Sequence, residues 1–344
     1  MKSLVFAQNY KRYRTGNYHM DLLNAIRKQT EAYVYGPGFP EYNINDDYET
    51  VLRKMNISED DIDVIIVSTN WENETSETES DLHPNICLAD VNEGVKKIFF
   101  LNKEYKKIEK KIEYILKNKF DLVVTVLPEK LYVQWQNATG IQFMQSHFGI
   151  NTNEFKNYKL ERKYDFTFTG SLHEAYTDKR ILVKKHLFKK PNVKASLGLP
   201  RVFSVSNPIK KEYQSYKIYW AEWGKLSTDL RGKSLLPSGR EYVKLMNMSK
   251  VFFSTLSADG IFGTRFFEIM ASGAVLFCPE DDYYGLLEDG YNCVMYKNDM
   301  SNFDERLREV LINERMRAKI VENAAIFCEK QNYEERLKNI FKQI

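Results

Sequence analysis

Short apolar runs alternate with amphipathic helical patterns along most of the chain, and this alternation constrains the fold more than any other feature. Residues 19–29 show the helical pattern, because Met20, Leu23 and Ile26 recur there at helical spacing. Strands that alternate with helices form parallel sheets with helices on both faces. The first half of the chain therefore predicts strands at 4–7, 32–36, 63–67, 97–101, 121–126 and 141–145.

The same alternation begins again in the second half. It follows a polar segment, residues 147–163, which has no clear periodicity and is typical of a linker between domains. From Asn302 onward the pattern is helical, and Asn332 with Glu335 three residues later is typical of a capping box that begins the last helix. The second half predicts strands at 164–170, 201–206, 250–256, 274–278 and 293–296.

These patterns predict an α/β protein with two Rossmann-like parallel-sheet domains. The N-terminal domain is expected at residues 1–158 and the C-terminal domain at 159–328, with a helix at 329–344 that returns to the N-terminal domain. In open parallel sheets, ligands bind outside the carboxyl ends of the strands. A binding site is therefore expected in a cleft between the two domains.

Composition is that of a globular protein, with 43% hydrophobic and 28% charged residues in a chain of 344, long enough for two domains. The four cysteines are far apart and form no C-x-x-C pair, which favours free thiols in a reducing compartment. The N-terminus lacks the apolar run of a signal peptide, and no stretch has the length of a membrane span. We expect a cytoplasmic protein.

Residues 263–278, GTRFFEIMASGAVLFC, place an arginine and a glutamate on the first turn of an otherwise apolar helix. Arg265 and Glu268 share one side of this helix, and one interpretation is an ordinary surface pair at i, i+3 spacing. The other is a ligand that carries both anionic oxygens and hydroxyls. Amides at Gly263 and Thr264 and the Arg265 guanidinium would hold phosphate, and the Glu268 carboxylate would accept hydrogen bonds from sugar or ribose hydroxyls.

Several segments resemble a known family. RFFEIMASGAVLF, EDGYNCVMYKNDMSNFDERLREVL and a terminal YEERL resemble the nucleotide-sugar half of GT-B glycosyltransferases, in the "glycosyl transferases group 1" set that includes spore-maturation-protein-like enzymes. YDFTFTGSLHEAYTDKRILVKKHL, residues 164–187, is similar to the start of the same half. The resemblance implies a GT-B fold and transfer of a sugar from a nucleoside-diphosphate sugar to a hydroxyl acceptor, a glycan or other surface polymer. It also implies a retaining reaction that needs no metal ion and no other cofactor.

The resemblance assigns roles to individual residues. Glu268 matches the second glutamate of the family's E-x₇-E pattern, which binds donor hydroxyls, and Arg265 would act with it in catalysis. The first glutamate should fall at position 260, where this chain has Gly260, so either the neighbouring Asp259 takes that role or the donor contacts differ. Further donor contacts are implied at Gly170 and Ser171, at Lys179 or Arg180 on the following helix, at Gly16 and Asn17 after the first strand, and at His147.

Each of these further contacts has a plain structural alternative. Gly170 and Ser171 can form a tight turn, and Lys179 and Arg180 can belong to a solvated basic helix face. The segment around Gly16 and Asn17 can be an ordinary strand–helix loop, and His147 can be a structural histidine.

Carboxylate clusters do not point to a metal site. The segment DDID, residues 60–63, precedes a strand and so lies at the wrong end of the sheet, while EDD at 280–282 follows a strand but has no accompanying histidine or spaced carboxylate. An inverting enzyme would need a base, which Glu72, Asp81 or His83 could supply, although these residues also suit a solvated acceptor loop.

Other classes of protein fit less well. A dehydrogenase is disfavoured because no G-x-G-x-x-G follows a strand. A non-catalytic nucleotide-sugar-binding subunit stays open because the first glutamate is missing. A DNA-modifying glycosyltransferase would need a basic surface, but lysines in the helix at 103–119 are interleaved with glutamates, which suits a solvated face first and an anionic membrane or polymer surface second. Nucleic acid is therefore not the favoured partner.

Overall fold

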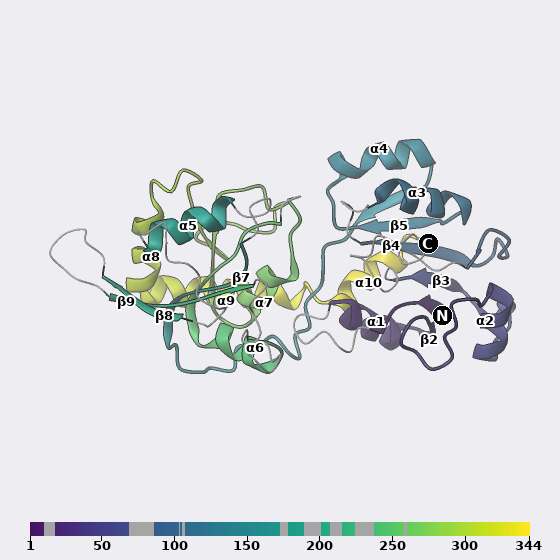
Figure 1. Cartoon of the computed structure of the whole chain (residues 1–344), viewed down its shortest axis with the longest axis horizontal. Coiled ribbons are helices and arrows are strands. Elements are labelled where there is room, and N and C mark those ends of the chain that lie inside the picture. Colours follow the sequence, from purple (N-terminus) through teal and green to yellow (C-terminus); the bar gives the residue numbers. More distant parts are fainter. Residues whose placement is uncertain are drawn as a thin grey trace. The chain divides into compact units, whose positions relative to one another are not determined.

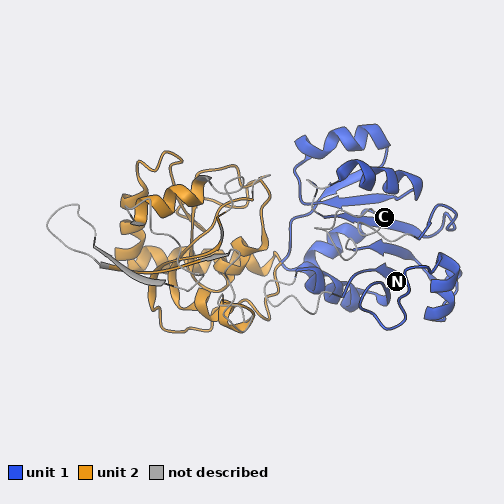
Figure 2. Cartoon of the chain, viewed as in Figure 1, with its two compact units in different colours: residues 1–149, 332–344 blue, residues 150–331 orange. Residues whose placement is uncertain are grey.

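The computed structural model describes residues 1–9, 18–68, 86–102, 104, 107–172, 178–188, 201–206, 215–223, 237–257 and 260–344. The chain divides into two compact units (Figure 2). Unit 1 comprises Met1–Gly149 and Asn332–Ile344, and unit 2 comprises Ile150–Gln331. Residues 150–158, expected in the N-terminal domain, thus belong to unit 2, where Ile150 and Phe155 are both 2% exposed in its core.

Unit 1 is built on a six-stranded sheet with the order β2-β1-β3-β4-β5-β6, and all its strands are parallel. Its strands match the six that the apolar runs predict: β1 (Lys2–Phe6), β2 (Glu31–Tyr35), β3 (Val64–Val67), β4 (Lys96–Leu101), β5 (Leu122–Thr125) and β6 (Gln142–Gln145). The strand Val64–Val67 shows why a central run is apolar throughout, since all four of its residues are 0% exposed. A strand buried on both faces cannot alternate polar and apolar residues.

Helices cover both faces of this sheet (Figure 1). One face packs against α2 (Tyr48–Met55), α3 (Ile108–Lys117) and α4 (Glu129–Thr139). The other face packs against α1 (Tyr18–Gln29) and α10 (Tyr333–Phe341). A short 3₁₀ turn, η1 (Glu59–Asp61), precedes β3.

Helix α10 is the C-terminal helix that the sequence predicts to return to the first domain. The Asn332 side chain accepts a hydrogen bond from the backbone N–H of Glu335 at 2.8 Å, which caps the helix as expected. Lys28 of α1 forms an ion pair with Glu334 at 2.6 Å, and Gln29 donates to the Glu334 carbonyl at 2.7 Å. The end of the chain is thus an integral part of unit 1.

Unit 2 contains a second six-stranded sheet, with the order β12-β11-β10-β7-β9-β8. The strands are β7 (Tyr164–Ser171), β8 (Arg201–Ser206), β9 (Ser215–Trp223), β10 (Ser249–Phe253), β11 (Val275–Pro279) and β12 (Val294–Tyr296). Strand β9 is absent from the sequence-based predictions. It pairs parallel to β7 and antiparallel to β8, so this edge of the sheet departs from the all-parallel arrangement expected.

Five helices of the described part of unit 2 flank its sheet. One face packs against α6 (Arg240–Asn247), α7 (Thr264–Ala271) and α9 (Glu314–Glu329). The other packs against α5 (Asp178–Phe188) and α8 (Phe303–Ile312). Helices α5 and α7 therefore approach the carboxyl end of the central strand β7 from opposite faces.

Within the ranges that the structure describes, no helix has the length and apolar character needed to cross a membrane.

Candidate functional site

Helix α7 is buried nearly all round. It begins after Gly263, which adopts an extended conformation as its N-cap, and ends before Gly273, whose φ of +75° is in the left-handed region that suits a helix end. Phe266 and Phe267 are 1% and 0% exposed, and Glu268 is only 4% exposed. The interpretation of Arg265 and Glu268 as a surface pair is therefore wrong, because the apolar faces of α6 and the sheet leave no open surface for the carboxylate.

A buried tyrosine links the two polar residues of α7. The Tyr242 hydroxyl, from α6, accepts a hydrogen bond from Arg265 Nε at 3.1 Å and donates to Glu268 Oε2 at 3.4 Å. Arg265 Nη1 also donates to the backbone carbonyl of Thr169 in β7 at 2.7 Å. The guanidinium is thus held at the carboxyl end of the sheet rather than extended into solvent.

Burial changes the ionisation of Glu268. Loss of solvation raises the pKa of this carboxyl to about 7, although a hydrogen bond from Thr264 and the positive charge of Arg265 act in the opposite direction. Near neutral pH the group is therefore close to the midpoint of its titration. A ligand that donates hydrogen bonds to this carboxylate stabilises its charged form, because these bonds replace the hydrogen bonds to water that are lost on burial.

A second arginine approaches the same strand end from α5. Arg180 Nε donates to the Thr255 hydroxyl at 2.8 Å, and its guanidinium carbon lies 6.0 Å from the centre of the Phe168 ring. Burial first, and then the nearby charge of Arg265, lower the pKa of Arg180 to about 10. Arg180 and Arg265 thus bring two guanidinium groups close together at the ends of β7 and β10. This arrangement suits an anion that contacts both.

Gly170 makes the approach of Arg265 possible. A Cβ atom at this position would lie 2.9 Å from Arg265 Nη1 and 3.1 Å from the Phe168 ring. The guanidinium lies in the space that a side chain would occupy. The glycine at the end of β7 thus leaves room for this contact, beyond the tight turn considered from the sequence.

The other residues that the sequence predicts for this site have different surroundings, and some of them lie outside the described ranges. Lys179 forms an ion pair with Asp281 at 2.8 Å. Ser171 ends β7, with only its backbone described. Gly260 has a φ of +70° and its carbonyl accepts from Tyr284 at 2.6 Å, so a glutamate in the same conformation would be strained. Asp259, Gly16 and Asn17 lie outside the described residues, as do Glu72, Asp81 and His83.

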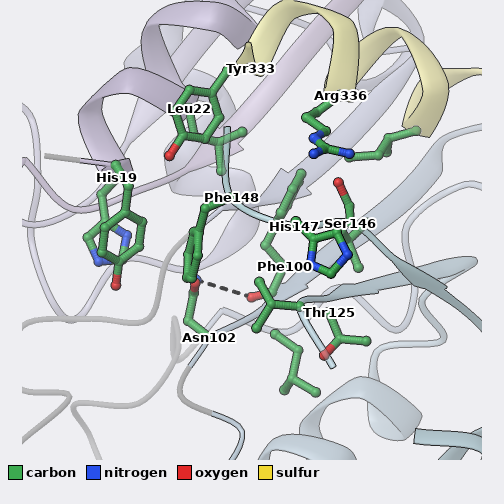
Figure 3. Close-up of a pocket in the computed structure, with 15 residues that line it drawn as sticks. His19, Leu22, Phe100, Asn102, Thr125, Ser146, His147, Phe148, Tyr333 and Arg336 are labelled. Atoms are coloured by element: carbon green, nitrogen blue, oxygen red, sulfur yellow. Dashed lines mark hydrogen bonds between the residues drawn. The ribbon is translucent and has the colours of Figure 1, made fainter. Parts of the chain in front are cut away.

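His147 lies in a pocket whose lining residues all belong to unit 1 (Figure 3). This pocket is at the carboxyl ends of β4, β5 and β6, and residues of α1 and α10 complete its wall. His147 is half-buried, and burial together with the charge of Arg336 lowers its pKa to about 4. Its lining residues are Tyr18, His19, Leu22, Phe100, Leu101, Asn102, Val124, Thr125, Val126, Ser146, His147, Phe148, Tyr333, Arg336 and Ile340.

Sequence reasoning missed Tyr242 and Arg336. Tyr242 is separated from Glu268 by 26 residues, and its position on α6 gives no local sign of this contact. The sequence pattern around Arg336 indicates only the last helix and gives no sign of a pocket.

Among the residues with described positions, no group of three or more His, Cys, Asp or Glu side chains is arranged to hold a metal ion.

Comparison with known proteins gives a family match for part of the chain. Residues 204–342 match a protein family described as glycosyl transferase-like. This match includes α6, α7 and the helices that follow, and therefore Arg265, Tyr242 and Glu268. No curated protein matches the chain.

Solved structures of GT-B proteins share the fold of the whole chain. HepE of Anabaena in complex with UDP-glucose has a TM-score of 0.59 and 12% sequence identity, with 100% of both chains covered. Sucrose-phosphate synthase of Thermosynechococcus elongatus has a TM-score of 0.57 and 9% identity, covering 100% of this chain and 99% of its own. A glycosyltransferase of Rickettsia africae has a TM-score of 0.54 and 10% identity, covering 99% of this chain and 97% of its own.

Proposed function

We propose that this chain, a glycosyltransferase of the GT-B type by its glycosyl transferase-like domain and its fold, transfers a sugar from a UDP-sugar to a hydroxyl acceptor. The observation that carries the proposal is the pair Arg180 and Arg265 at the carboxyl ends of β7 and β10, with the buried carboxylate of Glu268 beside it. A nucleoside-diphosphate sugar presents both the anionic oxygens and the hydroxyls that such a site would recognise.

The diphosphate is the natural ligand of the arginine pair. Two guanidinium groups can each donate in a fork to phosphate oxygens, and the first amides of α7, after Gly263, add donors at the positive end of a helix. Glu268 would accept hydrogen bonds from the ribose or from the donor sugar. We take uridine as the base because HepE, which has the same fold, was solved with UDP-glucose.

The reaction breaks the bond from the anomeric carbon to the phosphate oxygen and forms a bond from that carbon to the acceptor oxygen. The acceptor proton leaves with UDP, and the negative charge that grows on the diphosphate is stabilised by Arg180 and Arg265. We propose that these two charges serve in place of a divalent cation. We further propose retention of the anomeric configuration, on the resemblance to the group 1 set, and a glycan or other polymer as acceptor.

A panel of nucleotide sugars tests this proposal. A ligand that binds only the folded chain raises its melting temperature, so UDP-sugars should raise it with EDTA present, and uridine should raise it far less. Slow hydrolysis of the preferred UDP-sugar without acceptor should accompany binding. Binding with neither hydrolysis nor transfer to any acceptor would instead identify a non-catalytic subunit, an alternative that Gly260 in place of the family's first glutamate supports.

A further inference from the structure

We propose that the pocket of unit 1 binds a carboxylate group of the acceptor through Arg336, with Ser146 and His147 as hydrogen-bonding neighbours. This inference rests on the proposed function, because it names the chemical class of the acceptor: a sugar acid or another carboxylated glycan. All residues that line the pocket belong to unit 1.

The charge of the pocket favours an anion. Figure 3 shows the Arg336 guanidinium beside Ser146 and His147, above the ends of the strands. Among the lining residues that the structure describes, none carries a carboxylate, whereas one is an arginine and two are the histidines His19 and His147. The amino end of α1, which begins at Tyr18, also faces this site and adds the positive end of a 12-residue helix.

The carboxylate of Glu104 contacts residues of the pocket wall but does not line the pocket. Glu104 is 5% exposed and accepts hydrogen bonds from the Thr125 hydroxyl at 2.7 Å and from the Val126 amide at 3.2 Å. Burial raises the pKa of this carboxyl. Glu104 therefore holds Thr125 and Val126 in the wall of the pocket and is not itself one of the described lining residues.

The pKa of His147 depends on the charges around its ring. The lowered pKa of His147 means that its ring is neutral at physiological pH, while Arg336 keeps its charge. A neutral imidazole can donate one hydrogen bond to a bound oxygen. An anion placed against Arg336 would offset the repulsion between the two groups, and the pKa of His147 would rise.

The enclosed part of the pocket is small. Its volume is about 40 Å³, and each water needs about 10–15 Å³ of such space, so it holds a group of about three non-hydrogen atoms. A carboxylate has three and fits. The pocket opens to solvent, so the rest of the acceptor would lie outside it. Phe100 and Phe148 add apolar surface to the wall, which strengthens the pairing of charges.

Glucuronate, glucose and glucose 6-phosphate are the probes for a test. The chain has five histidines, so the His147 ring signal can be assigned by NMR with the His147→Gln variant. Glucuronate should bind at least about tenfold more tightly than glucose and should raise the pKa of His147 by at least about one unit, as expected for a charge within a few ångströms. Arg336→Gln should abolish this preference, and Arg336→Lys should retain part of it. Arg27→Gln, at an exposed arginine of α1, is the matched control and should change neither result.

Equal binding of glucuronate and glucose to the wild-type protein, with an unchanged His147 titration, would overturn the proposal. Preference for glucose 6-phosphate over glucuronate would overturn it in favour of a phosphate site. These wild-type comparisons stand even if Arg336→Gln does not fold, which circular dichroism would reveal. Failure of the proposed function would appear separately, as a wild-type protein that neither binds nor hydrolyses UDP-sugars.

Discussion

Replacement of Glu268 by glutamine changes the dependence of stability on pH, because the wild-type carboxyl is buried with a raised pKa. Below the ordinary pKa of 4.5, the group is protonated in both the folded and the unfolded chain and has no effect on the pH dependence. Between 4.5 and about 7 the unfolded chain releases its proton and the folded chain keeps it. The free energy of unfolding therefore falls as pH rises through this window.

The size of the effect follows from the two pKa values. A change from 4.5 to about 7, at about 1.4 kcal/mol for each pH unit, corresponds to about 3 kcal/mol. Glutamine has nearly the same shape and does not ionise. Relative to wild type, Glu268→Gln should therefore gain about 3 kcal/mol of stability between about pH 4.5 and about pH 8.

Urea unfolding at these two pH values measures the change directly. Glu305→Gln, at an exposed glutamate of α8, is the matched control and should keep a constant difference from wild type. A binding measurement distinguishes the effect on stability from the effect on function. At about pH 8 Glu268→Gln should be more stable than wild type yet bind UDP-sugars more weakly, because residues that bind a ligand often lower the stability of the folded protein. If the variant differed from wild type by the same amount at both pH values, the raised pKa and the reasoning from it would be refuted.

Three other variants test the contacts around α7. Arg265→Ala should lower kcat by the equivalent of about 2–4 kcal/mol, more than it weakens donor binding, because the charge on UDP grows in the transition state; steady-state kinetics with an unchanged kcat would contradict this. It should also lower the melting temperature, since the guanidinium bonds to the sheet inside unit 2. Gly170→Ala should displace Arg265 and weaken UDP binding measured by calorimetry, whereas Gly94→Ala, where a Cβ would meet no atom closer than 3.5 Å, should not; equal effects would show that the contact is unimportant. Tyr242→Phe removes a hydrogen bond that lowers the pKa of Glu268, so the pH at which donor binding reaches half its maximum should rise by up to about one unit, and an unshifted profile would argue against the bridging role.

The sequence predicts the sheets well because strands buried on both faces must be apolar throughout. Val64–Val67 shows this plainly, and all six strands of unit 1 lie where such runs occur. Strand β9 was missed, and burial does not alternate along it, since Ile218, Tyr219, Trp220 and Ala221 are all buried. Its antiparallel pairing with β8 depends on a contact between two segments, which neither segment specifies alone.

The candidate site could be predicted only in part, for a similar reason. Helical spacing places Arg265 and Glu268 on one side of α7 but cannot show what covers that side. The cover is α6, whose Tyr242 converts an expected cleft-facing pair into a buried network. The proximity of Arg180 and Arg265 could not be predicted either, because it requires two helices on opposite faces of the sheet to begin near the end of one strand.

Calorimetric titration of UDP and of uridine in the presence of EDTA tests the central claim most directly. If the two arginines hold the diphosphate without a metal ion, UDP should bind the wild-type protein at least about 100-fold more tightly than uridine, as two charge-assisted contacts of about 1.5–3 kcal/mol each allow. Arg180→Gln should reduce that ratio at least about tenfold while leaving uridine binding nearly unchanged. Equal affinities for UDP and uridine in EDTA, or a preference for UDP that appears only after a divalent cation is added, would contradict this account of the site.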